Sequence, residues 1–174
     1  MFADLTVAVE AGMILAALVY IRKVTATTTV SQVTDEYLRE GHVHILQHKE
    51  IPSYVTIFRI HGPFLFGATD KIEEVIHKIP ELPAILVLRL RNMTAIDATG
   101  LQALESLADA VHASGRGLIL CGAREQPARL MQQAEFEDHV GAGNISPSIS
   151  VALERAKVLY DEIEGKKLHE VGQG

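Results

Sequence analysis

The apolar positions of the chain change their spacing several times, and each change marks an expected structural element. The clearest change lies in residues 85–100, where an almost unbroken apolar run over residues 85–90 is followed by polar residues. A short apolar run without alternation predicts a central strand that is covered on both faces. From Leu101 onward the apolar residues recur at helical spacing, which predicts a helix over residues 100–114. A buried strand therefore leads through a polar loop into a helix.

The same patterns predict the other elements of the chain. Strands are expected over residues 42–48, 54–61 and 118–121, and helices over residues 69–79, 127–134 and 146–163. Strands that alternate with helices are typical of an α/β domain with a mainly parallel sheet. The first two strands can pair as a β-hairpin at one edge, and Gly62 and Pro63 are expected to end the second of them. Residues 139–144 are expected to form a loop.

The N-terminal segment has a different character from the rest of the chain. Residues 5–21 are apolar except for Thr6 and Glu10, and Arg22 and Lys23 follow at once. A helix of this length reaches about 25 Å, slightly less than the ~30 Å hydrocarbon core of a bilayer. Two interpretations are open: an amphipathic or buried helix, or the last part of a membrane helix with its cytoplasmic end at the basic pair. In a membrane, Glu10 would have to face a protein partner or a wet cavity.

These patterns divide the chain into four parts. Residues 1–23 are expected to form the apolar, membrane-type helix, and the threonine-rich residues 24–40 an extended linker. Residues 41–165 are expected to form the folded domain, and residues 166–174 a polar tail that frays.

Composition restricts the functions that the chain can have. It has 174 residues with 48% hydrophobic and 22% charged side chains, which fits a globular domain with an appendage. The net charge of −6 argues against nucleic acid as a partner. The single cysteine, Cys121, excludes an internal disulfide and a cysteine-rich zinc site. Because Cys121 lies in an apolar run, we expect a buried, inert thiol in a reducing cytosol.

The junction between the central strand and its helix is the best candidate for a functional site. Asp97 and Thr99 lie where the helix starts, and either side chain can cap its free N–H groups. No candidate nucleophile has a general base at a sequence spacing that is typical of a catalytic site. We therefore expect neither an enzyme nor a cofactor.

Two other groups of residues could bind a ligand. His42, His44 and His48 share one face of an expected strand, but no carboxylate or cysteine completes a metal site, so no metal is expected. Arg89 and Arg91, with Asn92, lie near the carboxyl end of the central strand, where open α/β sheets bind ligands. A nucleotide or another anion there remains open, although no glycine-rich phosphate loop accompanies these residues.

Three segments resemble a known family: GPFLFGA at residues 62–68, IDATGL at residues 96–101 and LILCG at residues 118–122. They are similar to the STAS domain at the C-terminus of SulP-type anion transporters. Residues 4–23 look like the last membrane helix of the same transporters. The resemblance implies an α/β STAS fold, with a mixed, mostly parallel sheet of four or five strands, helices mainly on one side and an apolar N-terminal helix.

The resemblance also implies a function. The chain would be a regulatory and interaction domain on the cytoplasmic side of a cell (inner) membrane transporter for sulfate, bicarbonate or dicarboxylate. It could not transport alone, because the transport site of that family lies in the membrane domain. The implied partners are that membrane domain and a cytosolic protein or a second copy of the chain. The expected contact for a partner or an anion consists of Thr94, Asp97, Thr99, Gly100 and Leu101.

A free-standing switch is the alternative. In anti-sigma-factor antagonists, a similar D-S-S-G or D-S-T-G motif carries a phosphorylatable hydroxyl just before the glycine. That position is Thr99 here, but Ala98 replaces the preceding hydroxyl. A phosphate on Thr99 would lie beside the free N–H groups of the helix, and Asp97 would repel it. Helix capping is the simpler explanation of the motif.

Overall fold

The computed structural model describes residues 2–25, 27–33, 51–65, 68–141 and 143–171. Within these residues the elements follow in the order α1 (Phe2–Thr25), β1 (Thr29–Gln32), β2 (Val55–Phe64), α3 (Asp70–Lys78), η1 (Ile79–Glu81), β3 (Ile85–Ile96), α4 (Ala98–Ala113), β4 (Gly117–Cys121), α5 (Glu125–Gln133), α6 (Glu137–Val140), β5 (Ile145–Ser146) and α7 (Ile149–Val171). The described strands form one five-stranded sheet in the order β1-β2-β3-β4-β5. Only the β1–β2 pair in it is antiparallel. The predicted α/β fold with a mixed, mostly parallel sheet is confirmed.

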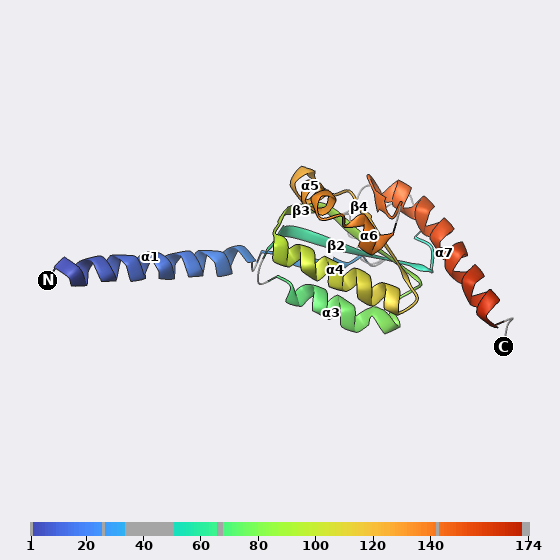
Figure 1. The fold of residues 1–174 in the computed structure, drawn as a ribbon, viewed down its shortest axis with the longest axis horizontal. Helices are drawn as coiled ribbons and strands as arrows, with labels where there is room; N and C mark the ends of the chain where they lie inside the picture. The colour runs from blue at the N-terminus through green and yellow to red at the C-terminus, as the bar shows by residue number, and fades with distance from the viewer. Residues whose placement is uncertain (1, 26, 34–50, 66–67, 142, 172–174) are drawn as a thin grey trace.

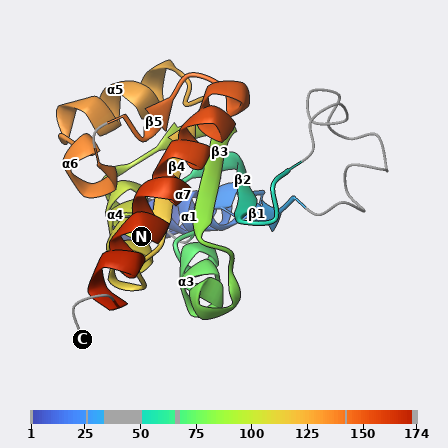
Figure 2. The same ribbon diagram turned by 90° about the vertical axis from the view of Figure 1, so that its right-hand side faces the viewer.

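The sheet separates two hydrophobic cores, because successive side chains of a strand point to opposite faces. Leu86, Leu88 and Leu90 of β3 belong to the larger core, together with residues of α3, α4, α5 and α6. Figure 1 shows α3 and α4 side by side in front of the sheet. Ile85 and Val87 belong to the smaller core, which α7 covers from the other face. Figure 2 shows α7 crossing β3 and β4.

The central strand β3 is longer than the apolar run predicts. Residues 85–90 are all buried, as expected, but the strand continues to Ile96. The polar residues that follow Leu90 are therefore part of the strand, and the expectation of a loop was wrong. The extension is stable because β2 pairs with it as far as Phe64, and because Met93 and Ile96 return to the larger core.

The expected end of β2 at Gly62 and Pro63 was also wrong, since the strand continues to Phe64. Proline has no N–H to donate to a neighbouring strand. Pro63 can lie in β2 because pairing with β1 ends at His61, so no β1 carbonyl depends on a hydrogen bond from position 63. The Pro63 carbonyl instead accepts a hydrogen bond from the buried Thr28 hydroxyl.

The expected linker contains the first strand of the sheet. Thr29–Gln32 form β1, which pairs antiparallel with residues 58–61 of β2. The segment is extended, as its β-branched residues suggest, and it belongs to the sheet. Residues 34–40 of the expected linker lie outside the described residues. The expected strand over residues 42–48 lies outside the described residues, so the β-hairpin remains a prediction. The described neighbours of β2 are β1 and β3.

The C-terminal helix and the loop before it also differ from expectation. α7 runs to Val171, so the helix continues into residues 166–171, which were expected to fray. Glu and Lys are good helix formers even where no apolar face guides them, and Glu162 precedes Lys166 by one turn. The expected loop over residues 139–144 includes the end of α6.

α1 extends away from the rest of the domain (Figure 1). Its large apolar side chains are exposed all around the helix, from 49% for Ile21 to 69% for Tyr20. The interpretation of this segment as a buried helix is therefore wrong. The described chain contains no helix that is both long enough and apolar enough to cross a membrane.

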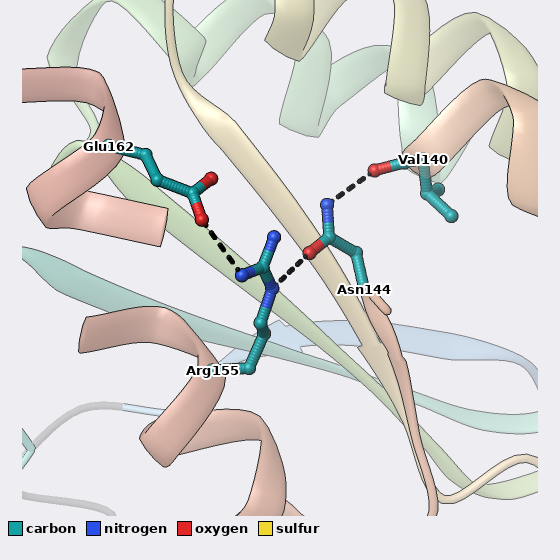
Figure 3. A network of polar contacts seen from close by, with 4 residues as sticks. All are labelled: Val140, Asn144, Arg155 and Glu162. Atoms are coloured by element: carbon teal, nitrogen blue, oxygen red, sulfur yellow. Dashed lines mark hydrogen bonds and ion pairs between the residues drawn. The ribbon is translucent and has the colours of Figure 1, made fainter. Parts of the chain in front are cut away.

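A polar network holds α6 and β5 against α7 (Figure 3). Asn144 is 5% exposed; its amide Nδ2 donates to the Val140 carbonyl at 2.7 Å, and its Oδ1 accepts from Arg155 Nε at 2.8 Å. Arg155 also pairs with the carboxylate of Glu162 at 3.1 Å. A buried amide needs hydrogen-bond partners. Asn144 finds them in Val140 and Arg155, and so connects the last turn of α6 to α7.

We expect Asn144→Ala to lower the free energy of unfolding by about 1–3 kcal/mol, because it leaves the Val140 carbonyl and Arg155 Nε without partners. Glu162→Ala, which removes only the half-exposed end of the network, should cost less than about 1 kcal/mol. Urea unfolding of both variants measures the difference. Equal losses would contradict the assignment of Asn144 as the structural centre of the network.

Candidate functional site

Asp97 caps the helix at the β3–α4 junction. Its backbone is extended, with φ −110° and ψ −178°, and its Oδ1 accepts a hydrogen bond from the Gly100 N–H at 2.8 Å. The Asp97 carbonyl accepts from the Leu101 N–H at 2.9 Å, which continues the turn. The sequence left open whether Asp97 or Thr99 caps the helix, and the structure shows that Asp97 does.

Gly100 is required by a close approach of two backbones. A Cβ added at this position would lie 2.5 Å from the Phe64 carbonyl oxygen and 2.9 Å from Phe64 Cδ1. Real Cβ atoms do not approach a backbone oxygen so closely, so only glycine allows α4 to begin against the end of β2. The glycine of the motif therefore has a packing role, and it is buried, so its expected role as a partner contact stays a prediction.

Side chains from the α5 region hold the end of β3. Gln126 accepts from the Ile96 N–H at 3.0 Å and donates to the Ile96 carbonyl at 2.8 Å. Arg124 Nε donates to the Arg91 carbonyl at 2.8 Å. Sequence analysis missed both residues, because a side chain that pairs with a backbone 30 or 33 residues away leaves no periodic signal.

The five predicted contact residues lie together at the junction but differ in exposure. Thr94 is exposed, and Asp97 and Thr99 are half-buried. Leu101 is 7% exposed and belongs to the larger core, so it adds little to the exposed surface, and its expected role as a partner contact stays a prediction. The helix stripe places Leu101 on the inner face of α4, with Leu104 and Leu107. The surface available for contact consists of Thr94, Ala98 and Thr99, with the edge of Asp97, and we call it the junction surface.

α1 leaves the domain at the same end of the sheet as the junction surface. Residues 27 and 28 connect α1 to β1 and lie against the end of β2, where a Cβ on Gly62 would be 3.1 Å from the Thr27 carbonyl oxygen. Thr28 also bonds to the Pro63 carbonyl. Phe64, the next residue of β2, contacts the first turn of α4 through Gly100. The start of α4 and the exit of α1 are therefore neighbours.

Other candidate groups lie elsewhere. Cys121 is buried in the smaller core, and burial raises the pKa of its thiol to about 11, so the thiol is protonated at neutral pH. Within the described ranges, no cluster of His, Cys, Asp and Glu could hold a metal ion. His42, His44 and His48 lie outside those ranges. A groove of about 730 Å³ between α5, α6 and β5 includes none of the predicted site residues.

The family model of the STAS domain matches residues 45–152. The chain belongs to the STAS domain family.

Relatives of this STAS domain include proteins named as sulfate transporters. The crystal structure of a sulfate transporter family protein from Wolinella succinogenes is 32% identical, with a TM-score of 0.60 over 66% of this chain and 94% of that chain. The SulP transporter STAS domain from Vibrio cholerae is 32% identical, with a TM-score of 0.55 over 68% of this chain and 92% of that chain. "Putative sulfate transporter YvdB" of Bacillus subtilis (strain 168) is 24% identical over 139 residues, or 79% of this chain. The chain spans 25% of the length of that relative.

We expect Gly100→Ala to destabilise this STAS domain by about 1–3 kcal/mol, because the new methyl group overlaps the Phe64 carbonyl. Gly165→Ala is the matched control, since a Cβ there meets nothing within 4 Å. In the helix α7 it should stabilise the domain by about 0.5–1 kcal/mol. Thermal unfolding of the two variants tests the packing role of Gly100. A stabilising Gly100→Ala would contradict the close approach of α4 and β2.

Proposed function

We propose that the chain is the cytosolic regulatory STAS domain of a SulP-type secondary anion transporter in the cell membrane. The observation that carries this proposal is the 32% identity to the SulP transporter STAS domain of Vibrio cholerae, which the chain covers almost completely. Sulfate, bicarbonate and dicarboxylate are the anion classes that we consider for the whole transporter. The role of this domain is binding and regulation, not transport or catalysis.

We further propose that the junction surface faces the membrane domain of the transporter. α1 leaves the domain beside the first turn of α4, so a membrane domain that holds the C-terminal end of α1 would lie close to Thr99. The exposed apolar side chains of α1 need a cover, and the helices of a membrane domain can supply one. Contacts at the junction surface would then connect the conformation of the membrane domain to this domain.

Photo-cross-linking tests the orientation. p-Benzoylphenylalanine replaces Thr99 in one variant and Lys157 in a control variant, because Lys157 is exposed on α7. Membranes from cells that make the transporter are illuminated, and mass spectrometry identifies the cross-linked peptides. The Thr99 variant should yield peptides from a SulP-type membrane domain, on the same chain or another, and the Lys157 variant should yield far fewer. Cross-links to that domain from position 157 alone would contradict the proposed orientation.

A further inference from the structure

Arg89 is a charged residue in an unusual position. It lies in the buried part of the central strand β3 and is only 8% exposed. It follows Val87 at the alternating spacing of a strand, so its side chain is on the α7 side of the sheet. Its direct neighbours in the adjacent strands are Arg59 of β2 and Cys121 of β4. A positive charge is therefore held within the sheet, next to a second arginine and a protonated thiol.

No counter-ion for Arg89 is found in the described part of the chain, where its guanidinium has neither a hydrogen bond nor an ion pair. Burial lowers the pKa of Arg89, and the nearby charges of Arg91 and Arg59 lower it further. The Cys121 thiol cannot compensate, because it is protonated at neutral pH. Buried charges in proteins are normally paired, so this arrangement lacks an anion.

A second arginine of β3, Arg91, follows Arg89 at the alternating spacing of a strand and lies beside a local irregularity of that strand. The register with β2 shifts between the pairs Arg59–Arg89 and His61–Asn92, so β3 contains one extra residue there. Leu90 and Met93 both return to the larger core, which leaves Arg91 directed away from it. The Arg91 Cβ lies 3.6 Å from a Cβ built on Gly122, just after β4. The extra residue explains the return of Met93 to the larger core, and β-bulges are frequent next to functional sites.

We propose that Arg89 and Arg91, with Arg59 beside them, bind a tetrahedral oxyanion of the sulfate or phosphate class on the α7 side of the sheet. The planar guanidinium groups of arginine match the oxygens of such an anion and form charge-assisted hydrogen bonds with them. The site lies beside Cys121, at the carboxyl end of the parallel strand β4, and open α/β sheets bind ligands at such strand ends. It goes beyond the proposed function, because binding there does not require a membrane domain.

Equilibrium dialysis of the intact chain with radiolabelled sulfate, and with radiolabelled phosphate, tests the proposal. Binding is measured against chloride at equal ionic strength, which removes unspecific attraction. One saturable site per chain is expected. Arg89→Met should weaken binding about tenfold or more, as the loss of a charge-assisted hydrogen bond predicts. Arg129→Met is the matched control: it removes the same charge from an exposed position on α5 and should leave the affinity within about twofold.

Circular dichroism shows whether each variant is folded. If Arg89→Met is unfolded, Arg91→Met replaces it, because Arg91 is exposed and its loss leaves the core intact. That variant should also weaken binding severalfold. Competition by glycerol 3-phosphate more strongly than by inorganic phosphate would support the site and show that it prefers a phosphate monoester to the free ion. Absence of saturable binding to the folded chain, or unchanged binding in the folded arginine variants, would overturn the proposal.

Discussion

The close approach between the first turn of α4 and the end of β2 is the constraint on which this structure depends. The Phe64 carbonyl leaves no room for a side chain at position 100, so only glycine fits there, and Asp97 caps the helix that begins at this point. For this contact to form, β2 must continue past Pro63 and β3 must continue to Ile96, and both strands do. The same end of β2 receives Thr28, so the contact also determines where α1 leaves the domain. Gly100 therefore belongs to the sequence motif, packs against the end of the sheet and lies close to the point where the N-terminal helix leaves the domain.

Much of the fold could be predicted from the sequence because its signals are local. The apolar run of β3 and the stripe of α4 indicate a buried strand and the helix after it, and both are confirmed. β1 was missed because the threonine-rich segment shows only that it is extended, while its pairing with residues 58–61 is a contact with a distant part of the chain. The polar end of β3 was missed for the same reason, since its strand conformation depends on pairing with β2.

The position of the candidate site in the fold could be predicted from the sequence, but the role of each residue in it could not. The motif located the junction, and capping by Asp97 was one of two predicted options. Gly100 and Leu101 face inward, because a helix places only part of its first turn on the surface. Gln126 could not be predicted, since its role depends on α5 lying beside the end of β3. The proposal that this surface and the exposed apolar side chains of α1 contact a membrane domain rests on the similarity to a SulP transporter STAS domain as well as on the geometry.

The proposed place of this domain beside a membrane domain depends on attachment through α1, and membrane flotation tests that proposal most directly. The intact chain and a version without residues 1–25 are each expressed in cells, and their distribution between floated membranes and the soluble fraction is measured. The account predicts that the intact chain floats with membranes or self-associates through α1, whereas the shortened chain remains soluble, folded and monomeric. An intact chain that stays in the soluble fraction as a monomer would contradict it.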